Sequence, residues 1–411
     1  MNKESRGVQR IYLSLTLSNT LAASFIWGIN TLFLLDAGLS NAEAFAFFTL
    51  GTMLFEVPTG VVADTWGRRA SYMIGSITLL VSTLLYLWMW RVQAPFYGWA
   101  LSSMFLGLGF TFFSGATEAW IVHAMKATGY DGPMEKVFAR GQVVAGVAML
   151  SGSLAGGLVA QLTNLGVPYI VRAGVLLVNF LLVLMLMRDL GFTPQKATKV
   201  GQAIKQILSA SVQHGLRNRP VRWVMLAAPF SAGVSFYAFY AMRPYLFKLY
   251  GEQAYGIAGL AAAIVAGAQI AGGLLVPRIR RLFGRRTTIL ALATALSVSA
   301  LVVIGMAQTF WLAIVVVVLW ALMFAATGSV RQAYLNGLIP SEQRATVLSF
   351  DSLVGSTGGV VAQPFLGRVA DVQGYGASYL VSAAVQLGAL PFALMARREK
   401  APADQIEATE T

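Results

Sequence analysis

Long apolar runs separated by short polar segments make up most of the chain. A helix needs about 20 apolar residues to cross the hydrocarbon core of a bilayer. About twelve runs of that size occur, at 11–35, 42–62, 70–90, 95–122, 137–162, 167–187, 221–240, 254–276, 287–307, 310–330, 345–366 and 377–395. They lack the alternation that barrel strands show. The pattern predicts an all-α integral membrane protein with about twelve transmembrane helices in two pseudo-symmetric six-helix bundles.

Composition supports a lipid environment. Of the 411 residues, 57% are hydrophobic and only 11% are charged, whereas soluble domains carry roughly 25% charged residues. No polar block of domain size interrupts the apolar runs, so we expect a single membrane unit. Cysteine is absent, which excludes disulfides and thiolate metal sites.

Basic residues predict the orientation. With the N-terminus inside, 24 of the 30 Lys and Arg residues fall in or beside the inner loops, so both termini are predicted to be cytoplasmic. The first ten residues are interpreted as a cytoplasmic start rather than a signal peptide. The net charge of +13 comes from clusters between spans, which favours anionic lipid over nucleic acid as the partner.

The longest polar stretch divides the spans six and six. We predict an N-terminal bundle at 1–190, a cytoplasmic linker at 191–220 and a C-terminal bundle at 221–411. Apolar residues recur at helical spacing in the linker, at Ile204, Ile207, Leu208 and Val212. This spacing fits an amphipathic helix on the inner membrane face, either as a solvated linker or as a regulatory element.

The two halves repeat short sequences in matching spans. Gly67-Arg68-Arg69 recurs as Gly284-Arg285-Arg286, and the glycine pair at 156–157 recurs at 358–359 within a longer similar segment. These repeats indicate duplication. Duplicated six-helix halves with a binding site between them are a transporter architecture.

The loop after the second run carries the pattern G-x-x-x-D-x-x-G-R-R. Its residues are Gly60, Asp64, Gly67, Arg68 and Arg69. Gly60 is expected to allow close helix contact, Gly67 a tight turn, and the two arginines an anchor to lipid phosphate or nearby carboxylates. An ordinary charged cytoplasmic turn is the alternative interpretation. The pattern resembles the signature of the loop between helices 2 and 3 in the major facilitator superfamily of secondary transporters.

The resemblance implies a conformational gate. In the superfamily the aspartate of this loop lies near the start of helix 11, which would begin here near Arg344. An anion at a helix N-terminus contributes about 0.3–2 kcal/mol, enough to bias a balanced equilibrium. In the second copy Pro277 replaces the acid, so we expect that copy to serve topology and lipid contact.

Charges within apolar spans are functional candidates, because each costs about 2.5–3.5 kcal/mol or more to insert. Glu118 is the first candidate for binding a proton or a cationic substrate, with Arg331 tuning it; a gating or packing ion pair is the alternative. Asp351 is the second candidate for the proton. Glu56 is assigned to the gate network. Arg172 either takes part in transport or snorkels from the outer end of helix 6.

Two segments look like those of bacterial multidrug or tetracycline-type exporters: Phe55-Glu56-Val57-Pro58-Thr59-Gly60 and Ser114-Gly115-Ala116-Thr117-Glu118-Ala119-Trp120. Two departures from drug antiporters are Ser153, where their helix-5 motif has proline, and Ser103, where their helix 4 has arginine. The resemblance implies proton-coupled efflux of a small amphipathic, drug-like compound by a monomer in the bacterial inner membrane. Beyond lipid, substrate and protons, no cofactor or metal is expected.

Alternative functions remain open at this point. A nutrient uptake symporter or a lipid-linked flippase fits the same architecture. A membrane enzyme would need a clustered acid, base or metal site; His123 and His214 have no metal-ligand partner by spacing, and a P-loop is absent. A membrane receptor would need a larger soluble domain.

Overall fold

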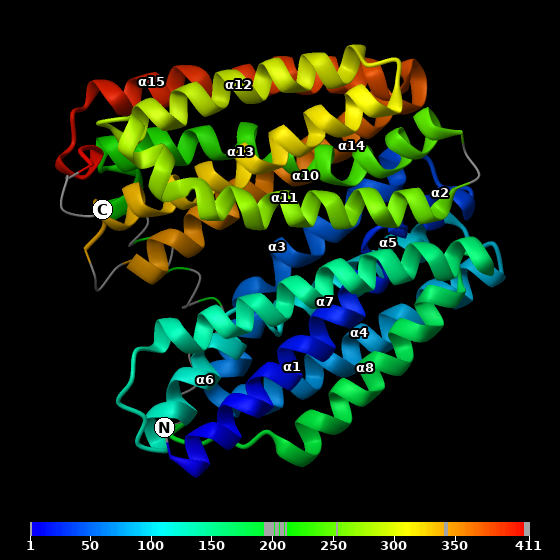
Figure 1. Cartoon of the computed structure of the whole chain (residues 1–411), viewed down its shortest axis with the longest axis vertical. Helices are drawn as coiled ribbons and strands as arrows, with labels where there is room; N and C mark the ends of the chain where they lie inside the picture. The colour runs from blue at the N-terminus through cyan, green and yellow to red at the C-terminus, as the bar shows by residue number, and fades with distance from the viewer. Residues whose placement is uncertain are drawn as a thin grey trace. The chain divides into compact units, whose positions relative to one another are not determined.

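The computed structural model describes residues 2–192, 201, 205, 209, 212–251, 254–340 and 344–406. These residues form helices joined by short turns (Figure 1), with one isolated antiparallel bridge between Arg285 and Gln405. The predicted linker helix lies mostly outside the described residues, including Ile204, Ile207 and Leu208.

The helices of the first half follow the predicted runs. They are α1 (Lys3–Trp27), α2 (Asn30–Asp36), α3 (Asn41–Trp66), α4 (Arg68–Arg91), α5 (Phe96–Thr111), α6 (Ala116–Ala127), α7 (Met134–Leu162) and α8 (Val167–Leu186). The first predicted span is a bent pair, because α1 and α2 meet at 44°. The fourth is likewise divided into α5 and α6, with Gly115 in the left-handed region between them.

The second half contains α10 (Arg219–Tyr250), α11 (Tyr255–Leu282), α12 (Arg286–Met306), α13 (Phe310–Asn336), α14 (Arg344–Leu387) and α15 (Leu390–Arg398), with short turns at Val212–Leu216 and Pro402–Asp404. Gly374 breaks α14, because its φ of 86° lies outside the helical region.

The count of apolar helices agrees with the prediction. In the described residues, ten helices are long and apolar enough to cross a membrane, or eleven when the bent pair counts as one span. One of them, Val347–Arg398, has 52 residues and would be about 78 Å long at 1.5 Å per residue. Since a hydrocarbon core is about 30 Å thick, this stretch, which is broken at Gly374, is long enough for two crossings. The all-α membrane fold is confirmed.

The contacts divide the chain into two compact units. Unit 1 comprises Met1–Leu39, Phe47–Gln202 and Ala254–Ala263, and unit 2 comprises Ser40–Ala46, Ala203–Gln253 and Ile264–Thr411. The predicted domain boundaries at 190 and 221 stay a prediction.

The repeated glycine pair has the same packing role in each unit. In unit 1, α7 packs along α1, and in unit 2, α14 packs along α10 (Figure 1). A Cβ at Gly156 would collide with the carbonyl of Phe25 on α1, and one at Gly358 would collide with the carbonyl of Pro229 on α10. The absence of a side chain therefore lets the helix backbones touch.

The start of α3 is held within unit 2. Asp371 of α14 accepts hydrogen bonds from the backbone N–H of Asn41 at 2.8 Å and of Ala42 at 3.1 Å. The Tyr375 hydroxyl donates to Asn41 Oδ1 at 2.7 Å. These contacts satisfy N–H groups that a helix start leaves unpaired, and they explain why α3 begins here.

Candidate functional site

An ion pair joins two of the predicted site residues. Arg331 of α13 donates from Nη1 to Asp351 Oδ2 at 2.6 Å and from Nη2 to Asp351 Oδ1 at 2.7 Å. Nη2 also donates to the Val224 carbonyl of α10 at 3.3 Å. Asp351, on α14, is only 7% exposed. Two parallel charge-assisted bonds fix both side chains strongly, so Arg331 is committed to Asp351 within unit 2.

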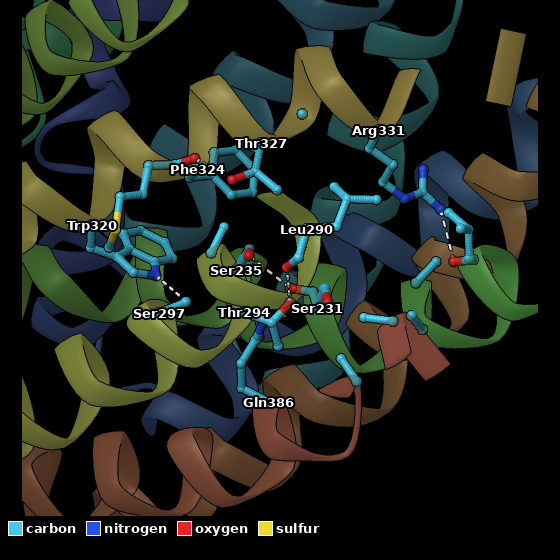
Figure 2. A pocket seen from close by; sticks show the side chains of 18 residues that line it. Ser231, Ser235, Leu290, Thr294, Ser297, Trp320, Phe324, Thr327, Arg331 and Gln386 are labelled. Atoms are coloured by element: carbon cyan, nitrogen blue, oxygen red, sulfur yellow. Dashed lines mark hydrogen bonds between the residues drawn. The ribbon is translucent and has the colours of Figure 1, made fainter. Parts of the chain in front are cut away.

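Arg331 lies at one end of a cavity inside unit 2 (Figure 2). The cavity has a volume of about 150 Å³ and is lined by residues of α10, α12, α13 and the junction of α14 with α15. Trp320 lies at the other end and donates from Nε1 to the Ser297 hydroxyl at 2.9 Å. The wall is apolar apart from a group of hydroxyl and amide side chains: Ser231, Ser235, Thr294, Ser297, Thr327 and Gln386.

The G-x-x-x-D-x-x-G-R-R loop forms the turn from α3 to α4. Asp64, near the end of α3, pairs with Arg68, the first residue of α4, at 2.5 Å. Gly67 has a φ of 98°, a conformation that favours glycine, as the predicted tight turn requires. Within unit 1, no neighbouring helix lies within 4 Å of where a Cβ of Gly60 would be, and the close helix contact expected there stays a prediction.

Asp189, after α8, completes this turn. Its Oδ1 accepts the backbone N–H of Arg69, the second residue of α4, at 2.9 Å. The Arg69 guanidinium donates to the Leu184 carbonyl at 2.8 Å. Arg69 is therefore anchored in two ways: the Asp189 carboxylate caps the start of α4 at the backbone N–H of Arg69, and the Arg69 side chain binds a carbonyl near the end of α8.

The second copy of the loop has an equivalent arrangement. Asp404, which follows α15, accepts the backbone N–H of Thr287, the second residue of α12, at 2.8 Å. Arg286 donates to the carbonyls of Ala403 at 2.6 Å and Gln405 at 3.0 Å. We expected this copy to serve topology and lipid contact; the structure adds that it binds the segment after α15.

The two other predicted carboxylates lie in unit 1. Glu56 of α3 accepts a hydrogen bond from the Ser114 hydroxyl at 2.7 Å. Glu118 is in the first turn of α6, exposed, and close enough to interact electrostatically with Tyr12 and Tyr72. Its predicted interaction with Arg331, like that of Asp64 with the helix start at Arg344, joins different units and stays a prediction.

The snorkelling alternative for Arg172 is wrong. Its side chain is 1% exposed inside unit 1. Nε donates to the Thr83 hydroxyl at 3.1 Å, and the guanidinium carbon lies 5.9 Å from the centre of the Phe110 ring. Nη2 is buried and has no hydrogen-bond partner among the described residues. Hydropathy located Arg172 along α8 but could not show that it faces inward.

Sequence reasoning missed Asp189, Asp404 and the unit 2 cavity. The two aspartates follow the sixth span of each half in polar segments, beside several other charges, so position alone did not distinguish them. The cavity hydroxyls are spread over three helices and have no motif.

The comparisons with known proteins identify the fold. A model of the Major Facilitator Superfamily matches residues 12–290 and 258–411. A mutant of the nucleoside transporter NupG is similar in structure, with a TM-score of 0.79 and 12% identity over 94% of this chain and 99% of that one. A bacterial homolog of the human lysosomal transporter Spinster, in an inward-facing, unoccupied conformation, has a TM-score of 0.73 and 15% identity over 99% and 100%.

A D-xylose–proton symporter has a TM-score of 0.65 and 16% identity over 95% of this chain and 96% of that one. At these identities the likeness concerns the fold alone. No curated protein matches the chain. Since the family model covers nearly all of it, the chain belongs to the Major Facilitator Superfamily.

Proposed function

We propose that this secondary transporter is a proton-coupled exporter of a small amphipathic compound and that Asp351 carries the proton. The supporting observation is the bidentate pair that Asp351 forms with Arg331, which lines one end of the unit 2 cavity. Glu118, the first candidate from the sequence, is exposed in unit 1 and has no hydrogen bond or ion pair with a described residue. The buried carboxylate is therefore the better candidate.

The pair can couple a proton to a conformational change. Protonating Asp351 removes the charge that compensates Arg331, and leaving this half-buried cation without a counter-charge is costly. The protonated protein then favours any conformation in which Arg331 reaches water or an acceptor on the substrate. A proton taken up on one side of the membrane thereby shifts the equilibrium between two states.

The test compares two carboxylate variants. Purified protein in liposomes is exposed to an imposed pH gradient, and substrate-stimulated proton flux is measured over a panel of amphipathic compounds. We expect D351N to lose proton-driven transport while it keeps downhill exchange of labelled substrate, and E118Q to keep both. Proton-driven transport by D351N, or its loss in E118Q alone, would assign the proton to a residue other than Asp351.

Direction and orientation need separate measurements. Energised cells should deplete an exported compound, whereas accumulation would support the uptake symporter. We further propose that the protein is a monomer in the bacterial inner membrane with both termini cytoplasmic. Tags at the two ends should then both be protected from reagents added outside intact cells, and a tag labelled from outside would contradict this orientation.

A further inference from the structure

Three of the hydroxyl groups that line the unit 2 cavity already donate their protons within the protein. A hydroxyl can donate one hydrogen bond and accept two. Ser235, Thr294 and Thr327 each donate to the backbone carbonyl four residues earlier, at 2.7, 2.8 and 2.6 Å. Each of them therefore presents only lone pairs to a ligand. Because they come from α10, α12 and α13, the cavity offers acceptors on three sides, and Figure 2 shows them grouped between Trp320 and Arg331.

The strongest donors of the cavity are also engaged. The Nη1 and Nη2 groups of Arg331 bind Asp351. Trp320 Nε1 donates to Ser297, and Gln386 Nε2 donates to Ser231 at 3.4 Å. The donors left are the hydroxyl protons of Ser231 and Ser297, a second amide proton of Gln386, and the Nε–H and second Nη1–H of Arg331, whose charge Asp351 already compensates. A ligand that only accepts, such as a carboxylate, finds no free cation here, whereas a ligand that donates finds several acceptors.

Size and shape narrow the ligand further. A cavity of about 150 Å³ is large enough for a benzene-sized molecule. The Trp320 and Phe324 rings lie 5.8 Å apart at 26° and line the same wall. Aromatic faces favour another ring or a cationic nitrogen.

We propose that this cavity is a binding site for a single aromatic ring bearing an amino group, with its two N–H groups directed at acceptors among Ser235, Thr294 and Thr327. The site lies within unit 2. If the proposed function is correct, such a ring is the transported substrate or the part of the substrate that this cavity binds; only this step of the inference rests on the proposed function. Binding itself can be measured without transport.

Aniline and toluene are the matched probes, because an amino group replaces a methyl group of similar size. Titration calorimetry on the purified full-length protein gives the affinity of each. We expect T327V and T294V, which keep the side-chain shape, to lower the ratio of aniline affinity to toluene affinity by about two- to tenfold, as expected for a lost neutral hydrogen bond. The control is T78V, whose hydroxyl bonds to the Ile74 carbonyl at 2.8 Å in unit 1; it should leave the ratio unchanged.

The results separate the site from the proposed function. An unchanged ratio in both cavity variants, or no aniline binding by the unmodified protein, would overturn the site even if proton-driven transport is found. The expected change in the ratio would support the site even if D351N keeps its proton-driven transport. Retention on size-exclusion chromatography verifies that each variant is folded.

Discussion

The two aspartates that follow the sixth span of each half should act as separate helix caps. Asp189 accepts the Arg69 N–H at the start of α4, and Asp404 accepts the Thr287 N–H at the start of α12. Asp404 is 2% exposed, so solvent screens its interaction little. The perturbation is D404A, which removes the carboxylate and leaves the backbone intact.

The magnitude follows from the geometry. A carboxylate at a helix N-terminus in a partly buried site, with a charge-assisted hydrogen bond, contributes about 1–2 kcal/mol. Local opening of the first turn of α12 should become more favourable by this amount. Amide hydrogen exchange of a peptide containing Thr287 should then accelerate by about five- to thirtyfold, measured by mass spectrometry in detergent.

The matched control is D189A. It should accelerate exchange of the peptide containing Arg69 at the start of α4 and leave the Thr287 peptide unchanged, while D404A should do the reverse. Exchange rates at Thr287 that do not respond to D404A would refute the capping role. Acceleration of both peptides by either variant would show general unfolding and would equally refute two independent caps.

Three further predictions concern the loop and the buried charges. G67A should accelerate exchange at the start of α4 and lower the thermal midpoint, because alanine is strained at a φ of 98° and its Cβ would collide with Asp189; an unchanged midpoint would contradict this. R172M should raise the thermal midpoint, since it removes a buried cation with an unpaired nitrogen, and a fall would argue for an unseen counter-charge. R331M should destabilise the protein by about 3–5 kcal/mol, while R331M/D351M should recover most of that loss, monitored by thermal unfolding on size-exclusion chromatography; equal losses would show that the stranded charge is not the cause.

The sequence by itself determined the helices and their approximate limits. In lipid each backbone polar group must be satisfied within its own segment, so a run of about 20 apolar residues has little choice but to be a helix. The glycine pairs at 156–157 and 358–359 and the turn at Gly67 were likewise readable, because these positions require a missing side chain or a positive φ. Arg331 and Asp351 were recognised as candidates because of the cost of burying a charge.

Only the tertiary structure decided which groups meet. A span that is apolar on all sides has no polar stripe to show which side faces the core. The sequence therefore predicted how far along its helix Arg172 lies, but not that its side chain faces the interior of the bundle. The partners of Arg69 and Thr287 lie more than 100 residues away in the chain, and no local spacing connects them. The cavity exists because α10, α12, α13 and the α14–α15 junction leave room between them. Such a space depends on how whole helices pack against one another, and the pattern of residues along the chain does not predict it.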